Sequence, residues 1–156
     1  MTEVLIYTDG ACSGNPGRGG YGAILVYGEK EKTLSEGFRK TTNNRMELLG
    51  VIRALETLKE PCRVQLYSDS KYVIEAIEKG WAVTWRKNGW KRKSGPAQNP
   101  DLWGKLLDLL DTHVLTCHWV KGHAQNENNN RCDAMAVAAY GKDNLKIDTE
   151  YEKGNP

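Results

Sequence analysis

A glycine-rich segment between two apolar runs constrains the fold most strongly. Residues 10–22 read GACSGNPGRGGYG, and GRGGYG within them matches the dinucleotide-binding pattern G-x-G-x-x-G. That pattern binds a pyrophosphate only where its loop opens a helix. The residues after Gly22 are AILVY, which favour a strand and show no helical period. The match is therefore accidental, and the segment is predicted to be a hairpin turn whose bare backbone could still face a substrate.

Apolar periodicity extends this hairpin into an α/β pattern. Runs rich in apolar and β-branched residues predict strands over residues 3–9, 20–28, 32–41, 63–70 and 114–120. One-sided apolar spacing and Pro or Gly stops predict helices over residues 43–59, 71–80, 81–88, 101–113 and 131–142. The adjacent early strands indicate antiparallel pairing, and the helix-separated later strands indicate parallel additions. The chain is therefore predicted to be an α/β protein, with a mixed sheet that carries helices on its faces.

Length and composition indicate one domain. The chain has 156 residues, enough for a continuous core, and its charged residues 143–156 are expected to form a loose tail on a domain of residues 1–142. No apolar run approaches the roughly 20 residues of a membrane span, and the start MTEVLIYTDG lacks a signal peptide's basic residues. We expect a cytoplasmic monomer with no membrane partner. The four cysteines form no C-x-x-C pair and are expected to be free thiols.

The charge distribution indicates an anionic partner. The net charge is only +2, but the segment between Lys79 and Pro100 contains no Asp or Glu. Tryptophans interleave with its cations and offer apolar faces to sugars and bases, while the cations meet phosphates. Its basic residues are Lys79, Arg86, Lys87, Lys91, Arg92 and Lys93, and its tryptophans are Trp81, Trp85 and Trp90. A core role for Trp81 and Trp85 is the alternative, and we favour partial burial with a substrate-facing edge.

Four carboxylates occupy predicted strand ends and helix starts: Asp9, Glu47, Asp69 and Asp133. Each of them could instead have a purely structural role. Glu47 could be the capping partner of Asn44, and Asp69 could be an N-cap. Asp9 could form a turn, and Asp133 could stabilise the start of a helix. Strand ends and helix starts of an α/β sheet meet at one edge, where such carboxylates repel one another unless cations bind. Oxygen-only ligands indicate Mg²⁺ or Mn²⁺. Two such ions could support phosphodiester cleavage.

His123 is the candidate for proton transfer. It lies in GHAQNENNN, a polar segment without an apolar period, whereas His113 and His118 lie at a predicted helix end and in a strand. A loop histidine near the metal edge could carry a proton to the leaving group or help the product leave.

Several separated motifs together resemble ribonuclease H of type I, the bacterial single-domain kind. They are YTDGACSGNPGRGGYG, TTNNRMELLGVIRAL, YSDSKYV and HWVKGHAQNENNNRCD, with GWAVTWRKNGWK before the last of them. The resemblance covers residues 3–141 and implies a five-stranded mixed sheet, with strands 1–3 antiparallel and helices on both faces. It places the family's acidic quartet on Asp9, Glu47, Asp69 and Asp133, and the family's catalytic histidine on His123.

The resemblance also implies contacts to an RNA–DNA hybrid. The basic segment, about residues 80–98, is similar to the family's basic protrusion, which grips the DNA strand. Other positions would face the minor groove, where 2′-hydroxyls mark the RNA, or hold a DNA phosphate. The implied contacts are Cys12, Asn15, Lys40, Thr42, Asn43, Asn44, Lys71, Trp81, Trp85, Arg86, Lys87, Trp90, Lys91 and Asn99. Lys40 stands where many relatives have Arg, Lys71 where Gln is frequent, and Gln125 where Gly is usual.

The implied function is a metal-dependent endonuclease that hydrolyses the RNA strand of an RNA–DNA hybrid. Two Mg²⁺ ions, or Mn²⁺ in their place, would be bound with the substrate, Asp9 would bridge them, and the products would carry 5′-phosphate and 3′-hydroxyl ends. Two alternatives stay open: a DNA-directed nuclease or integrase-like enzyme, and a non-catalytic hybrid-binding module. The asparagine-rich TTNN and the basic segment favour hybrids.

Overall fold

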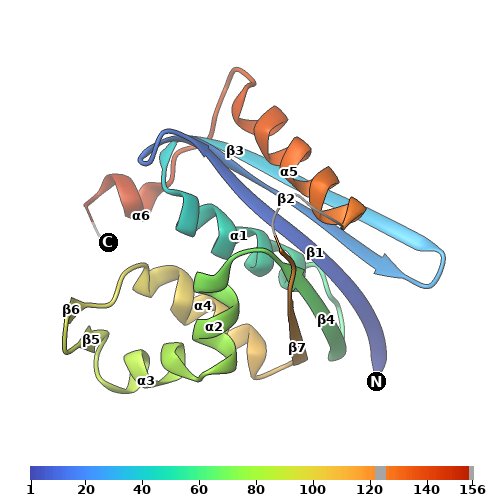
Figure 1. The fold of residues 1–156 in the computed structure, drawn as a ribbon, viewed down its shortest axis with the longest axis horizontal. Coiled ribbons are helices and arrows are strands. Elements are labelled where there is room, and N and C mark those ends of the chain that lie inside the picture. Colours follow the sequence, from blue (N-terminus) through green and yellow to red (C-terminus); the bar gives the residue numbers. More distant parts are fainter. Residues whose placement is uncertain (122–125, 155–156) are drawn as a thin grey trace.

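A five-stranded mixed sheet forms the centre of the molecule (Figure 1). The computed structural model describes residues 1–121 and 126–154. The strands lie in the order β3-β2-β1-β4-β7; β1 to β3 pair antiparallel, and β4 and β7 extend the sheet in parallel. The predicted mixed sheet, with its first three strands antiparallel, is confirmed. The strand bounds are Thr2–Ser13 for β1, Gly17–Tyr27 for β2, Lys30–Thr41 for β3, Cys62–Ser68 for β4 and Val114–Trp119 for β7.

Helices cover both faces of this sheet, as expected. Helix α5 lies across β1, β2 and β3 on one face, and α1 packs on the other face with α2 and α4 beyond it (Figure 1). A small hairpin of Lys91–Arg92 (β5) and Gly95–Pro96 (β6) follows α3. Within residues 1–121 and 126–154, no helix is long and apolar enough to cross a bilayer. The helix bounds are Asn43–Glu56 for α1, Lys71–Glu78 for α2, Trp81–Lys87 for α3, Pro100–Leu110 for α4, Glu127–Tyr140 for α5 and Thr149–Glu152 for α6.

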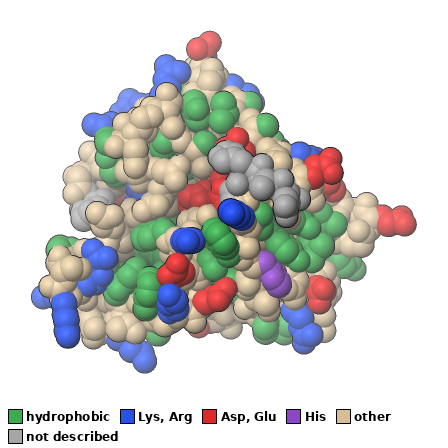
Figure 2. Space-filling view, in the orientation of Figure 1, with side chains coloured by type: hydrophobic (Ala, Val, Ile, Leu, Met, Phe, Trp, Pro, Cys, Tyr) green, Lys and Arg blue, Asp and Glu red, His purple; other side chains and the backbone are tan. Residues whose placement is uncertain are grey.

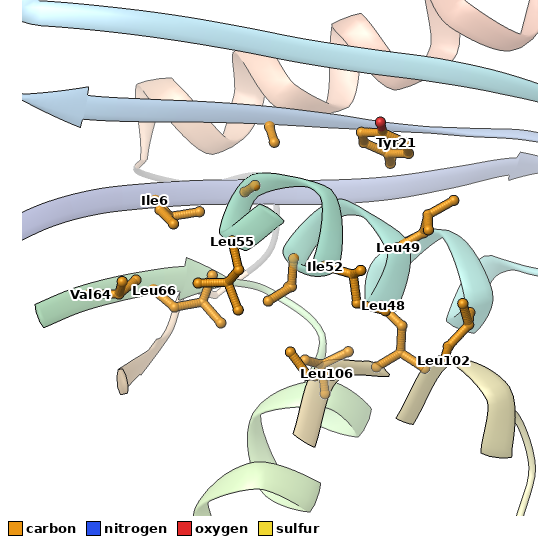
Figure 3. Packing of buried hydrophobic residues seen from close by; sticks show 14 of the residues in the cluster. Ile6, Tyr21, Leu48, Leu49, Ile52, Leu55, Val64, Leu66, Leu102 and Leu106 are labelled. Atoms are coloured by element: carbon orange, nitrogen blue, oxygen red, sulfur yellow. The ribbon is translucent and has the colours of Figure 1, made fainter. Parts of the chain in front are cut away.

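The main core lies between the sheet and α4, with α1 running through it (Figure 3). Leu48, Ile52 and Leu55 recur at helical spacing on α1 and are fully or almost fully buried. They point toward Leu106 of α4 and toward apolar side chains of the sheet such as Leu66 (Figure 3). Burial of each such side chain contributes about 1.5–3 kcal/mol, so α1 is held at a fixed place beneath the sheet.

Several helix boundaries differ from the predicted ones, most of all at the ends of α1 and α4 and at the start of α5. Helix α1 ends at Glu56, before the predicted residue 59. Helix α5 begins at Glu127, four residues before the predicted start, because the Asn126 side chain caps it by accepting a hydrogen bond from the Asn129 N–H (3.1 Å). The polar composition of the segment therefore concealed the first turn of this helix.

The C-terminal segment packs on the domain, which differs from the expected loose tail. The backbone of Lys146 bonds to β3, and Asp148 is buried, where its carboxylate accepts hydrogen bonds from Thr41 and Arg45 (2.7 Å each). Near the end of α6, Glu152 pairs with Arg39. Polar contacts, which a count of apolar residues does not register, hold this segment in place.

Candidate active site

Parallel pairing of β1 and β4 brings two of the predicted carboxylates to one edge of the sheet. Tyr7 of β1 is opposite Tyr67 of β4, and Asp9 and Asp69 each follow two residues later. Glu47 reaches the same edge from the start of α1. Carboxylate oxygens of Asp9, Glu47 and Asp69 lie within 4.8 Å of one another. Figure 2 shows acidic side chains near the middle of one face, beside Lys or Arg side chains.

Gly10 allows this close approach. A Cβ at Gly10 would lie 2.5 Å from the Glu47 backbone nitrogen, so only a glycine lets α1 come this near to β1. The Gly10 N–H donates to Asp9 Oδ1 (2.9 Å) and also to Glu47 Oε1. One backbone donor is thus shared by two carboxylates.

The carboxylates of this cluster are held in an electrically unfavourable arrangement. Burial raises the pKa of Asp9 to about 7, with further increases from the charges of Asp69 and Asp133. Burial also raises the pKa of Glu47 well above its usual value, and the charges of Asp9 and Asp69 add to the increase. Negative charges this close become acceptable when a proton or a cation joins them. The cluster therefore has the properties of a cation site.

Helix α5 carries the fourth predicted carboxylate to this edge. Asp133 is half-buried, and its charge is close enough to raise the pKa of Asp9. The neighbouring Cys132 donates its thiol to the Tyr7 carbonyl (3.3 Å), and the Cys132 carbonyl lies where a Cβ on Gly22 would be only 2.3 Å away. Close packing of α5 on glycine thus sets the position of Asp133 over β1.

The donor set fits a divalent cation that prefers oxygen. The clustered side chains offer only carboxylate oxygens, the ligands typical of Mg²⁺ and Mn²⁺. The raised pKa values of Asp9 and Glu47 give the cluster a reason to bind positive charge. The predicted proton carrier His123 lies outside the described residues.

A polar pocket of about 310 Å³ lies beside the start of α1. Within it, Asn99 is buried, has a left-handed backbone (φ 59°), and its amide contacts Arg45 and Tyr72. The Asn15 side chain accepts a hydrogen bond from the Asn43 N–H (3.1 Å), which joins the β1–β2 turn to α1. The pocket is lined by Asn15, Thr42, Asn44, Gln98, Asn99 and Tyr151. Four of these are predicted contacts, and Gln98 and Tyr151 are new.

Three other predicted contacts lie apart from this pocket lining. Asn43 belongs to the first turn of α1, Lys40 is exposed on β3, and Cys12 is half-buried on β1. Burial raises the pKa of the Cys12 thiol to about 11, so it stays protonated near neutral pH. Thr42 lines the pocket and also caps α1, because its hydroxyl accepts a hydrogen bond from the Arg45 N–H (3.2 Å). Asn44 is therefore not the capping residue that the sequence offered as an alternative partner of Glu47.

The basic protrusion, residues 80–98, consists of α3 and the β5–β6 hairpin. Trp81 is 42% exposed, whereas Trp85 is half-buried and meets the edge of Trp103 of α4, with ring centroids 5.9 Å apart. Trp90 is also half-buried against the core. The partial burial predicted for Trp81 and Trp85 is thus confirmed for Trp85 and is wrong for Trp81, which is exposed.

The cations of the basic protrusion differ in their partners. Lys87 and Lys91 are exposed, and no described residue forms an ion pair with either of them. Arg86 forms a 2.8 Å salt bridge with Asp108 of α4. The segment contains no Asp or Glu of its own, but Asp108, which follows it in the sequence, is adjacent to Arg86 in space and balances its charge.

Trp119 is a site residue that the sequence did not reveal. Its indole N–H donates to the backbone carbonyl of Asp69 (3.1 Å), and the residue is 46% exposed. Lys71 lies over this ring, with its Nζ 4.9 Å from the centroid. The two residues thus form a cation–π pair beside the carboxylate cluster. A signal was available, since Trp119 lies near the end of the strand predicted over residues 114–120, which pairs in parallel with the strand that leads to Asp69.

A mixed α/β sheet with a cluster of carboxylates at one edge is typical of one class of protein, the hydrolases that use divalent cations to cleave phosphodiesters. Residues 1–140 match the family model described as RNase H. The chain is 60% identical over 149 residues to a ribonuclease H of Desulforamulus reducens, covering 95% of this chain and 94% of the relative. It is 51% identical over 153 residues to ribonuclease HI of a Synechocystis species, covering 97% and 96%.

A solved structure agrees with these relatives. LC9-RNase H1, described as a type 1 RNase H with the type 2 active-site motif, superposes with a TM-score of 0.81 at 30% identity, covering 99% of this chain and 81% of that one. The chain belongs to the ribonuclease H family, in its bacterial type I branch. It is accordingly an endoribonuclease that acts on RNA–DNA hybrids, in a family for which divalent metal dependence is typical.

Proposed function

We propose that Asp9, Glu47, Asp69 and Asp133 carry the hydrolysis of the RNA strand, which leaves 5′-phosphate and 3′-hydroxyl ends. The observation that carries this proposal is the gathering of Asp9, Glu47 and Asp69 oxygens within 4.8 Å of one another. Burial that raises the pKa of Asp9 and of Glu47 supports it, because buried carboxylates this close together are more stable with a cation bound than without one.

The proposed cofactor is Mg²⁺, with two ions bound in the presence of substrate and Mn²⁺ as a substitute. When bound, these ions supply a water of lowered pKa and stabilise the charge on the departing 3′ oxygen. Asp9 would contribute ligands to both ions, and Glu47, Asp69 and Asp133 would complete their coordination. His123 would assist proton movement, an assignment that rests on the family motif.

Substrate binding is proposed for three regions around this cluster. The polar pocket lined by Thr42 and Asn99 would hold a phosphate of the DNA strand, together with the neighbouring Lys40. Asn15, Asn43 and Asn44, with Cys12, would face the minor groove and its 2′-hydroxyls. The basic protrusion and Lys71 would bind further phosphates. We propose a cytoplasmic monomer of one domain, residues 1–142, with residues 143–156 as a charged tail whose residues 143–154 pack on the domain.

Incubation of a labelled RNA–DNA hybrid with the protein tests this function. Cleavage of the RNA strand is expected with Mg²⁺, and loss of cleavage is expected with EDTA or in the Asp69→Asn variant. The variant should still bind the hybrid, because its phosphate contacts remain. Cleavage that survives chelation would contradict the mechanism.

The same assay separates the alternatives. Unlabelled duplex DNA should compete weakly with the hybrid, whereas equal competition and DNA cleavage would favour a DNA-directed nuclease or integrase-like enzyme. A non-catalytic hybrid-binding module would bind without cleaving in any metal.

A further inference from the structure

A single amide joins the two strands that carry Asp9 and Asp69. Asn129 lies in the first turn of α5, and its Nδ2 donates to the backbone carbonyls of Thr8 (3.1 Å) and Tyr67 (3.0 Å). Thr8 directly precedes Asp9 on β1, and Tyr67 lies two residues before Asp69 on β4. The separation of these two strand ends is thus tied to one side chain.

Asn129 also determines the position of α5, the helix that carries the fourth carboxylate. Asn129 and Asp133 are four residues apart on α5, so they share one face of the helix. The Asn129 N–H is held by the Asn126 cap (3.1 Å). Asn129 therefore fixes the first turn of α5 against β1 and β4, and with it the approach of Asp133 to Asp9.

The oxygen of this amide is left without a partner. Asn129 is 8% exposed, and its Oδ1 is buried with no hydrogen-bond partner among the described residues. A buried carbonyl oxygen costs free energy unless it accepts a hydrogen bond. In a polar region beside a carboxylate cluster, a water molecule is the natural donor to this oxygen.

We propose that Asn129 is a positioning residue of the carboxylate site. Its Nδ2 fixes the spacing of Asp9 and Asp69, and its Oδ1 accepts a hydrogen bond from a water molecule bound with the cation. Outer groups of this kind hold the ligands in the geometry that the cation requires, so their loss weakens cation binding. The inference rests on the proposed cation site at Asp9, Glu47 and Asp69.

The asparagine run of α5 supplies a matched control. Asn130 is exposed, and among the described residues its side chain forms no hydrogen bond, so Asn130→Ala makes the same chemical change without touching the strands. Mn²⁺ affinity without substrate is measured by isothermal titration calorimetry, and kcat and KM are measured on the labelled hybrid. We expect Asn129→Ala to lower Mn²⁺ affinity and kcat by about 10-fold or more, with KM changed less than about twofold. Asn130→Ala should match the wild type.

A purely structural role predicts a different result. If folded Asn129→Ala shows only a lower Tm, with Mn²⁺ affinity and kcat like those of Asn130→Ala, the inference is wrong. Should Asn129→Ala fail to fold, Asn129→Ser replaces it, because a hydroxyl can still donate to one of the two carbonyls. Asn129→Ser should give an intermediate Mn²⁺ affinity, and wild-type affinity in this variant would overturn the proposal. A wild type that binds Mn²⁺ but leaves hybrids uncut would count against the proposed function alone.

Discussion

Single residues decide how closely the carboxylates approach one another. Gly10 lies where β1 meets the start of α1, and a Cβ there would lie 2.5 Å from the Glu47 nitrogen and 2.7 Å from the Met46 carbonyl carbon. Both are backbone atoms, so the contact can be relieved only by moving the helix. The distance between Asp9 and Glu47 is therefore set by the absence of a side chain between them.

The Gly10→Ala variant tests this spacing. We expect α1 to shift away from β1, with a loss of about 1–3 kcal/mol in the free energy of unfolding and a fall of about 100-fold in kcat. Gly104→Ala is the control, because Gly104 lies in α4 and its nearest contact would be Trp90 at 3.9 Å. Urea denaturation and hybrid cleavage are the measurements, and wild-type kcat in Gly10→Ala would contradict the argument.

The raised pKa of Asp9 predicts how stability depends on pH without metal. The value rises from 3.8 to about 7 on folding, so between these pH values the folded state binds a proton more tightly than the unfolded state. The free energy of unfolding should therefore fall as pH rises through this window, by at most about 1.4 kcal/mol per pH unit from this group. Urea denaturation in EDTA at several pH values measures the slope. Asp9→Asn should flatten it, and a slope identical to wild type would count against the assignment.

At the scale of elements, the sequence predicts types better than boundaries. Apolar periodicity predicted which segments are strands and which are helices, because the burial of one face of an element fixes the spacing of its apolar residues. The start of α5 was missed, since Asn126 caps a turn made of polar residues. The neighbours of the carboxylates were missed for a related reason: Trp119 and Asn129 act through hydrogen bonds to the backbone of distant strands. Such contacts depend on how the elements pack, which no local pattern records.

The basic protrusion makes an element-scale prediction about salt. Lys87 and Lys91 are exposed on it, and the double substitution to Ala should weaken hybrid binding and reduce the slope of log affinity against log salt by about 2. Binding is measured with the Asp69→Asn variant, so that the substrate stays intact. Lys59→Ala removes one exposed charge outside the basic protrusion and should leave the slope unchanged. An unaltered slope in the double variant would show that the protrusion does not meet phosphates.

Across the whole molecule, Arg45 connects the start of α1, α4 and the C-terminal segment. Its side chain is only 2% exposed and forms salt bridges of 2.7 Å with both Asp101 and Asp148. Arg45 also donates to Asn99, which lines the polar pocket. Docking of the C-terminal segment and the shape of that pocket thus depend on the same buried cation.

Removal of one carboxylate partner of Arg45 should lower the free energy of unfolding substantially. Asp148→Ala is expected to destabilise the protein by about 3–5 kcal/mol, because the Arg45 charge stays buried with less compensation. Glu152→Ala removes a partner of the exposed Arg39 and should cost less than about 1 kcal/mol. Urea denaturation compares the two, and equal losses would contradict a central role for Arg45.

The parallel pairing of β1 with β4, which lie far apart in the sequence, has a consequence for how the enzyme is synthesised. Asp9 and Asp69 meet only after β4 has left the ribosome, and Asn129 and Asp133 emerge later still. A growing polypeptide is therefore expected to leave hybrids uncut until the segment that carries Asp133 has emerged.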